Sequence, residues 1–453
     1  MVSIINAQIV NEGRVFKGSI QIDGTLITAV VPDGMPFQAV GDVIDADGRY
    51  VIPGVIDEHV HFREPGLTSK GDILSESRAA AAGGVTSFFD MPNTKPQTTS
   101  LEELDNKMAL GKARSLVNYA FYIGATDDNL PTLEKVTASS VPAIKLFMGA
   151  STGNMLVDND EALESIFRIA RSRNLPVVTH CEDSAQIARN EARILAEVGQ
   201  DAGVEYHPVI RDEKECLDST RRAIELATHS GAALLVAHVS TSREIEEIAC
   251  CGAGNVKAEV CVAYLCFNDS DYLTLGSRIK CNPAIKSAEC QAGLLDALLK
   301  GMVTTVATDH APHLLADKEG GVFSATSGMP SVQFSLPLML QLTDRGIIDI
   351  IKVVEVMCHN PSRFFGVKQR GFIREGFKAD LVVLNYLTAP HTITDSDVVS
   401  KCGWTPYIGQ KLNWQVATTI CNGTVVYTND KGIITPEYRG EAIEFDHDND
   451  KAI

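Results

Sequence analysis

Two histidines separated by one residue, His59 and His61, lie in an apolar run that begins at Ile52. In a β-strand, residues i and i+2 face the same side, so both imidazoles point one way. Two neutral imidazoles on one side suit a divalent metal ion. Arg63 follows two residues later, and its guanidinium is a bidentate partner for a carboxylate. A His-x-His pair alone is more often a solvated strand end, so the rest of the chain has to decide.

Other residues with metal-binding or polar side chains recur at the ends of apolar, β-rich segments. These residues are Asn93, Lys145, His180, His238 and Asp309. Each has an ordinary explanation by itself, such as a buried histidine, a turn residue or a helix cap. Their coincidence at several predicted strand ends favours a shared metal site, because the carboxyl ends of parallel strands meet at one edge.

The elements that would position these residues alternate between strand and helix. The predicted strands are 55–61, 85–90, 118–124, 143–148, 176–180, 234–238, 256–261 and 303–309. The predicted helices are 70–82, 101–114, 160–172, 182–198, 212–229, 241–251 and 287–299. This alternation predicts an α/β fold, a (β/α)8 TIM barrel. A doubly wound open sheet is the alternative, but no GxGxxG follows the first strand of this region.

Short β-rich segments flank the alternating region at both ends. Residues 1–53 and 370–436 each contain too few residues to bury a core alone. We therefore expect them to pair into one composite β-sandwich, with the barrel of residues 54–369 inserted between them. The polar, acidic stretch 437–453 is expected to be a C-terminal surface tail.

The candidate ligands suit two divalent ions better than one, and two ions need an anionic group between them. Lys145 as an ammonium would repel both ions. If its neutral amine takes up CO2, the resulting carbamate can bridge them, and burial favours the neutral amine. An ordinary charged lysine at the barrel mouth is the alternative. Zinc is the first expectation for this cofactor, although manganese or cobalt fits similar ligands.

The charge and cysteine content of the chain limit the kinds of molecule that it is expected to bind. The formal net charge of -18 argues against a nucleic-acid partner but allows a small anionic substrate in a pocket that contains an arginine. The 11 cysteines form no metal-binding cluster, which indicates free thiols in the cytoplasm. No signal peptide and no apolar run of about 18 residues is evident, so no membrane association is expected. Homo-oligomerisation stays open.

Five motifs carry a family resemblance: HVHFREPG, DMPNTKP, VVTHCED, VAHVSTS and ATDHAPH. Together they resemble the cyclic-amidohydrolase branch of the metal-dependent amidohydrolase superfamily, and within it the dihydroorotase family. The resemblance covers essentially the whole chain. It implies reversible hydrolysis of the cyclic amide of dihydroorotate to N-carbamoyl-aspartate, the third step of pyrimidine biosynthesis.

The resemblance also implies roles for individual residues. One zinc would be bound by His59 and His61, the other by His180 and His238, with carbamylated Lys145 as the bridge. Asp309 would bind the first ion and act as general base and acid. The remaining implied contacts are to the substrate, whose carboxylate would be held by Arg63, Asn93 and His313, and whose ring would be held by Asn282 and the backbone near 328–330.

Two observations keep other functions open. Many bacterial dihydroorotases with the HFREPG motif use an aspartate bridge, whereas IKLFMGAS resembles lysine-bearing relatives such as hydantoinases. Another cyclic amidohydrolase, a hydantoinase (dihydropyrimidinase) or an allantoinase, is therefore the nearest alternative. Relatives with allantoinase activity tend to carry asparagine at the position of Arg63, and hydantoinases lack the FRE segment, which favours dihydroorotase. An inactive assembly partner is the second alternative, but such relatives lose metal ligands. Residues 314–327 are a candidate lid.

Overall fold

The computed structural model describes residues 1–149 and 155–448, and its central element is a barrel of parallel strands. Its strands are β6 (Val55–Val60), β7 (Val85–Asp90), β8 (Asn118–Phe121), β9 (Ile123–Gly124), β10 (Ile144–Phe147), β11 (Val177–His180), β12 (Leu234–Val236), β13 (Val256–Cys261) and β14 (Thr305–Ala307). A six-stranded ladder runs from β9 to β14, and β6, β7 and β8 form a three-stranded ladder. A bridge between Val60 and His310 connects the last strand position to the first. The predicted barrel is confirmed, with the expected strand 118–124 divided into β8 and β9.

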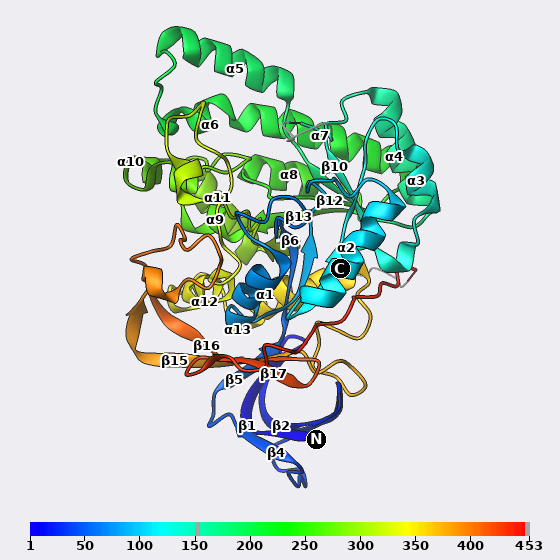
Figure 1. The fold of residues 1–453 in the computed structure, drawn as a ribbon, viewed down its shortest axis with the longest axis vertical. Helices are drawn as coiled ribbons and strands as arrows, with labels where there is room; N and C mark the ends of the chain where they lie inside the picture. Colours follow the sequence, from blue (N-terminus) through cyan, green and yellow to red (C-terminus); the bar gives the residue numbers. More distant parts are fainter. Residues whose placement is uncertain (150–154, 449–453) are drawn as a thin grey trace.

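Helices surround the barrel (Figure 1). They are α1 (Ile73–Ala82), α2 (Leu101–Arg114), α3 (Leu130–Lys135), α4 (Asp160–Ser172), α5 (Ser184–Glu197), α6 (His207–Ile210), α7 (Glu213–Ser230), α8 (Ser242–Cys250), α9 (Val262–Cys266), α10 (Tyr272–Leu275), α11 (Ala288–Leu299), α12 (Ser335–Asp344), α13 (Ile350–Val354) and α14 (Asn360–Phe365). Local capping residues set several starts. Asp72 caps α1 and Ser100 caps α2, each accepting a hydrogen bond from the backbone N–H three residues on. Helix α1 therefore begins at residue 73, later than the predicted 70.

Strands from both ends of the chain form a second domain. They are β1 (Val2–Asn11), β2 (Arg14–Asp23), β3 (Leu26–Pro32), β4 (Asp42–Asp45), β5 (Tyr50–Pro53), β15 (Leu381–Thr392), β16 (Lys411–Cys421), β17 (Thr424–Thr428) and β18 (Gly432–Ile433). Antiparallel pairing of β5 with β15 joins them into one mixed nine-stranded sheet. The two halves of the sheet share a core, in which Ile4 and Ile20 cluster with Leu381 and Ile420. The composite β domain is confirmed, and its exact boundaries stay a prediction.

The C-terminal segment differs from the surface tail expected for 437–453. Its described part runs upward from the β domain alongside α2 (Figure 1), and Gly440 N–H donates to the Ser115 carbonyl at 2.9 Å. Ile443 and Phe445 are 2% and 1% exposed, and they pack in a core cluster with Phe89 and Tyr122. Two apolar side chains within an acidic stretch are enough to bury it, because each removes a large area from water. Residues 449–453 lie outside the described residues.

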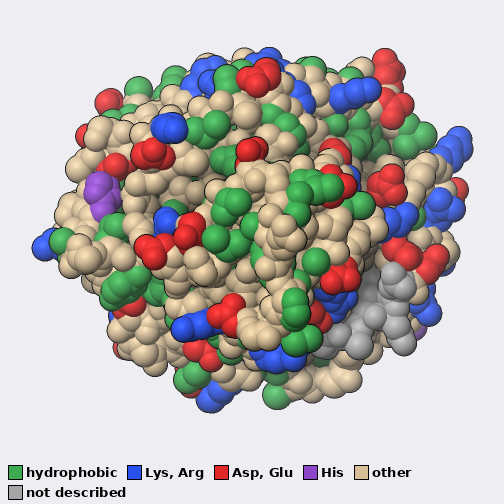
Figure 2. Space-filling model, turned by 90° about the horizontal axis from the view of Figure 1, so that it is seen from below, with side chains coloured by type: hydrophobic (Ala, Val, Ile, Leu, Met, Phe, Trp, Pro, Cys, Tyr) green, Lys and Arg blue, Asp and Glu red, His purple; other side chains and the backbone are tan. Residues whose placement is uncertain are grey.

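On the face seen from the β-domain end, the surface has no large patch of like charge. Acidic, basic and apolar side chains are interspersed there (Figure 2). None of the described helices is long and apolar enough to cross a membrane. The cysteines are free thiols, and Cys181, Cys216 and Cys261 are among the buried ones.

Candidate active site

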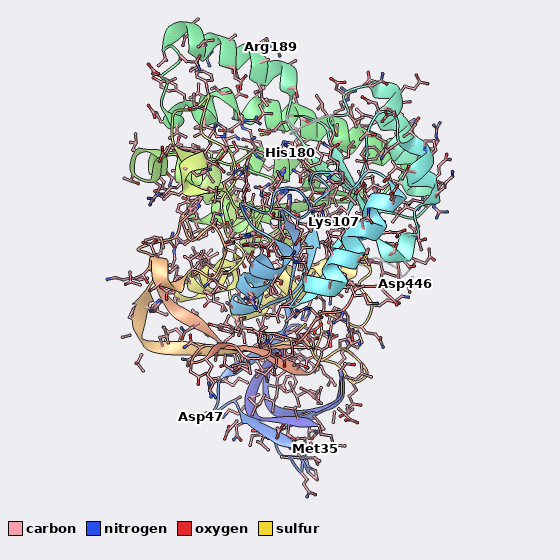
Figure 3. The ribbon with its side chains drawn as sticks, viewed as in Figure 1. Met35, Asp47, Lys107, His180, Arg189 and Asp446 are labelled. Atoms are coloured by element: carbon pink, nitrogen blue, oxygen red, sulfur yellow. The ribbon has the colours of Figure 1, made fainter. Side chains whose placement is uncertain are left out.

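A cavity of about 780 Å³ opens at the carboxyl ends of the barrel strands. Figure 3 places His180 in the barrel, far from Met35 and Asp47 at the tip of the β domain. The sequence-predicted site residues that line this cavity are His59, His61, Arg63, Asn93, His180, His238, Asn282, Asp309 and His313. Residues more than 250 positions apart therefore meet, because the strand order of the barrel brings their ends together.

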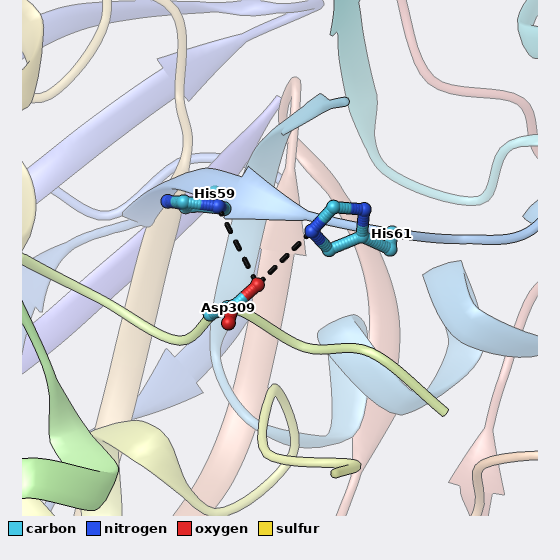
Figure 4. A group of neighbouring side chains, drawn as sticks. All are labelled: His59, His61 and Asp309. Atoms are coloured by element: carbon cyan, nitrogen blue, oxygen red, sulfur yellow. Dashed lines mark hydrogen bonds and ion pairs between the residues drawn. The ribbon is translucent and has the colours of Figure 1, made fainter. Parts of the chain in front are cut away.

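The first group of candidate ligands consists of His59, His61 and Asp309 (Figure 4). Asp309 Oδ1 lies 3.0 Å from His61 Nε2 and 3.4 Å from His59 Nε2. The three ligand atoms all lie within 4.8 Å of one another. This spacing lets one ion contact two imidazoles and one carboxylate, a donor set that suits zinc.

The outer nitrogens of these two histidines face acceptors. His59 Nδ1 lies 2.7 Å from Glu259 Oε1, and His61 Nδ1 lies 2.8 Å from Asn93 Oδ1. A carboxylate or amide oxygen only accepts, so each Nδ1 carries the proton and each Nε2 keeps its lone pair toward Asp309. Burial holds the pKa of His59 well below its usual value, which favours the neutral, metal-binding form.

His180 and His238 form the second group. His180 Nδ1 lies 2.9 Å from His238 Nε2, and His180 Nε2 donates to Glu182 Oε2 at 2.7 Å. The other ring nitrogen of His180, Nδ1, therefore carries no proton and keeps its lone pair. His238 Nδ1 is buried without a hydrogen-bond partner among the described residues. The imidazoles of His238 and His59 are 5.1 Å apart between centroids, so the two groups are adjacent.

Lys145 lies inside β10, beside β11, and is fully buried. Its Nζ has no hydrogen-bond partner within the described part of the chain. Burial lowers the pKa of Lys145 to about 8, while Glu259 and Asp309 oppose this shift. A buried amine without a partner fits poorly as a structural lysine, because an unsatisfied ammonium is costly to bury. It fits the neutral amine that carbamate formation requires.

The backbone is strained at three of these positions. Arg63, His238 and Asp309 have φ angles of 69°, 41° and 47°, in the left-handed region that non-glycine residues seldom adopt. Such strain persists where the surrounding structure holds a side chain in a required place, and it clusters at functional sites. Burial raises the pKa of Asp309, but His59, His61 and His238 outweigh it and hold the pKa well below its usual range.

The wall of the cavity beside this cluster is rich in hydrogen-bond donors. Arg63 Nη2 lies 3.0 Å from His313 Nε2, and Lys70 Nζ lies 3.0 Å from His313 Nδ1. Arginine and protonated lysine are donors only, so the His313 ring lies between two donors. Burial, followed by Arg63 and Lys70, lowers the pKa of His313 to about 2, which keeps it neutral. Burial also lowers the pKa of Arg63 to about 10.

The other predicted contacts lie on the same cavity. Asn282 lies beside the start of α6, where His207 Nε2 is 2.8 Å from the Cys281 carbonyl and 3.1 Å from Asn282 Oδ1. Asn93 lines the cavity, but its Oδ1 is engaged by His61. Only the Asn93 amide nitrogen can therefore serve the predicted carboxylate contact. Gly328 also lines the cavity, with its backbone near the His313 ring.

Sequence reasoning missed three residues that contact predicted site residues: Glu182, Glu259 and Lys70. Glu259 interrupts the apolar strand β13, and Glu182 follows His180 by two residues. A carboxylate in an apolar strand was the available signal, because burial of a charge demands a partner. Lys70 had no comparable signal, since a lysine in a polar loop is usually solvated.

Residues 50–426 match the amidohydrolase family. The chain is 34% identical over 431 residues to a dihydroorotase of Halobacterium salinarum, covering 94% of this chain and 97% of that protein. It is 30% identical over 439 residues to an allantoinase of Desulfitobacterium hafniense, covering 95% and 96%. The solved structure of L-hydantoinase (dihydropyrimidinase) from Arthrobacter aurescens superposes with a TM-score of 0.89 at 29% identity over 97% of each chain. Relatives of three named activities thus match at similar identity.

Proposed function

Because this chain belongs to the amidohydrolase family, we propose that it is a dihydroorotase. It would reversibly hydrolyse the cyclic amide of (S)-dihydroorotate to N-carbamoyl-L-aspartate in pyrimidine (UMP) biosynthesis. The metal would be zinc, with two ions per subunit bound by the residues expected from the sequence and bridged by carbamylated Lys145. The free cysteines support a cytoplasmic location.

The observation that carries the proposal is the ring of His313 between two donors. A neutral imidazole has one lone pair and one N–H, so it can accept from Arg63 or from Lys70 but not from both. The other ring nitrogen then faces a second donor. The Asp317 carboxylate lies 3.7 Å from Lys70 Nζ and 3.8 Å from His313 Nδ1, so it balances part of the charge on Lys70 from outside the ring. A carboxylate supplies several lone pairs and a negative charge. Dihydroorotate carries a ring carboxylate, whereas hydantoin and allantoin do not.

Different residues of the chain would bind the substrate carboxylate, the ring amide and the metal ions. Arg63, His313, Lys70 and the Asn93 amide nitrogen hold the substrate carboxylate, which fixes the ring over Asp309. Asn282 and the Gly328 backbone hold the ring amide. Ions bound by the histidines and Lys145 would lower the pKa of the attacking water and polarise the ring carbonyl.

Asp309 would carry the proton. Its carboxylate accepts a proton from the attacking water and passes it to the ring nitrogen as the carbon–nitrogen bond breaks. In the reverse direction, Asp309 takes the proton from the ureido nitrogen as that nitrogen attacks the side-chain carboxyl carbon. Asp309 then returns the proton to the carboxyl oxygen, whose bond to carbon breaks as it leaves as water. The neighbouring imidazoles lower the pKa of Asp309, so its carboxylate is ionised when the water binds.

A hydantoinase is the competing function, supported by the structural similarity to L-hydantoinase. Both activities open a cyclic amide, and both suit the metal ligands described above. They differ in the group that the donor-rich wall must bind. A neutral hydantoin has no carboxylate to accept hydrogen bonds from Arg63 and Lys70. Buried donors without partners disfavour the wrong substrate strongly.

A single assay separates these functions. The metal-replete protein is given dihydroorotate, hydantoin and allantoin in parallel, and kcat/KM is compared. We expect dihydroorotate to be preferred by about 10²-fold or more, because only its carboxylate pairs with the donors. Preference for hydantoin or allantoin contradicts the proposal. No turnover of any substrate with metal bound favours the inactive assembly partner.

A further inference from the structure

Two buried lysines next to the cavity take no part in the proposed reaction. Lys318 and Lys280 are 2% and 6% exposed. Their Nζ atoms donate to backbone carbonyls, and neither forms an ion pair with a carboxylate of the described residues. A buried ammonium is costly unless each of its three N–H groups finds an acceptor. Their positions therefore need a reason.

Lys318 finds all three acceptors. It lies in a short 3₁₀ turn, Leu315–Lys318, and its Nζ donates to the carbonyls of Thr326 at 2.6 Å, Gly328 at 2.8 Å and Lys280 at 3.0 Å. The first two carbonyls belong to the loop that returns to the cavity. The third belongs to the segment that leads to Asn282. One ammonium therefore joins two walls of the same cavity.

A second contact holds the same junction. The Lys280 carbonyl also accepts the Gly328 N–H at 2.8 Å, so one oxygen receives hydrogen bonds from both Lys318 and Gly328. Gly328 has a φ of 124°, and a Cβ placed on it would lie 3.1 Å from His313 Cδ2. The backbone thus lies against the imidazole of His313. A shift of this wall would change the space beside that ring.

We propose that Lys318 is a positioning residue, which clamps residues 326–328 to the segment before Asn282 and so keeps the substrate pocket formed before substrate binds. This inference does not depend on which cyclic amide is the substrate. It also revises the lid expected over 314–327. The inner part of that segment is fixed, and only the outer residues, among them Leu314, Leu315 and Ser324, are exposed.

The chain supplies a matched control. Lys280 is also buried and also forms no ion pair with a carboxylate of the described residues. Its Nζ, however, donates to the carbonyls of Val322 and Ala325, neither of which lines the cavity. Replacing Lys280 by methionine removes a comparable buried ammonium that donates to the loop after Lys318, while leaving the Lys280 backbone carbonyl in place. A general loss of loop stability would affect both variants equally, whereas a clamp on the pocket wall depends on Lys318.

The test compares Lys318→Met with Lys280→Met in the metal-loaded full chain. Hydrogen exchange is followed at the Gly328 amide at about pH 6, below the pKa of about 7 to which burial lowers Lys318, so that the ammonium is present. We expect exchange at Gly328 to rise about tenfold or more in Lys318→Met. In this variant the Gly328 amide can open to solvent without breaking the three hydrogen bonds that Lys318 donates in the wild type. Lys280→Met should leave this amide within about threefold of wild type.

Kinetics provide the second readout, with whichever substrate the protein turns over best. Lys318→Met should raise KM about tenfold with kcat within about threefold and with unchanged metal content, because binding geometry is lost and the chemistry is not. Unchanged exchange at Gly328, or equal effects in the two variants, overturns the proposal. If Lys318→Met does not fold, Lys318→Gln replaces it. Failure of both to fold assigns Lys318 to global stability and likewise overturns the proposal.

Discussion

The histidines of the metal cluster and His313 of the donor-rich wall are the same residue type in opposite surroundings. In the cluster, the outer nitrogens of His59, His61 and His180 face oxygen acceptors. In the wall, both nitrogens of His313 face nitrogen donors. Neighbouring acceptors turn the lone pair of an imidazole inward and select a cation. Neighbouring donors leave N–H groups without acceptors and select an anion.

The largest expected effect follows from removing the bridge. Lys145→Ala should lower kcat by about 10³-fold or more and reduce bound metal, because the proposed carbamate would no longer be there to bridge the two proposed ions. Short carboxylic acids in the buffer should restore part of the activity by occupying the space of the lost side chain. Activity and metal content are measured together, with the exposed Lys300→Ala as control. Full activity in Lys145→Ala would reject the bridging role.

The donor-rich wall should respond without loss of metal. Arg63→Ala should raise KM for dihydroorotate by about 10²-fold, since a buried charge-assisted pair with the carboxylate is lost. Metal content, measured by elemental analysis, should stay at the wild-type level. Arg193→Ala, on the exposed face of α5, serves as the control. Metal loss in Arg63→Ala would mean that this arginine supports the cluster, and the contrast between the two regions would fail.

His359 sharpens the comparison because it has one donor and one acceptor. Its Nδ1 donates to the Gly371 carbonyl at 2.7 Å, and its Nε2 accepts the Glu12 N–H at 2.9 Å. The neutral ring is fully paired, so we expect no ligand there.

Burial lowers the pKa of His359 to about 4. Between that value and the ordinary pKa of about 6.5, the unfolded chain binds a proton that the folded chain does not. The contribution to stability is present above pH 6.5 and is lost as the pH falls toward 4, by at most about 3 kcal/mol. Denaturant unfolding of wild type and His359→Gln across this range measures the difference. A difference that is independent of pH would contradict this account.

The smallest effect concerns the acceptors behind the metal ligands. Glu259→Gln should weaken metal binding about 10- to 100-fold, because the imidazole of His59 loses its charged partner. Glu182→Gln should act in the same way through His180. Chelator competition gives the metal affinities, and KM for dihydroorotate should change less than in Arg63→Ala. A larger change in KM than in metal affinity would erase the distinction between the two regions.

The sequence predicted the barrel because each strand was a short apolar run and a helical pattern followed most of them. It missed α12 and α14, which follow the last strand, and the burial of Phe445, because an acidic stretch with two apolar residues carries no periodic signal. It placed the candidate ligands at strand ends, since strand register and barrel closure follow from the order of elements. It could not give the tautomers of His59 and His61, because these depend on Glu259 and Asn93, which come from other parts of the fold.

The sequence by itself determined the alternation of elements, the histidine pair on one strand face and the presence of Arg63 two residues later. These depend on local periodicity, which a chain carries in its own order of residues. Only the tertiary structure decided that Lys70 and Arg63 meet on His313, and that Lys318 joins two walls of one cavity. Those contacts depend on side chains that come from distant segments, and their hydrogen-bond roles are fixed only once the neighbours are in place.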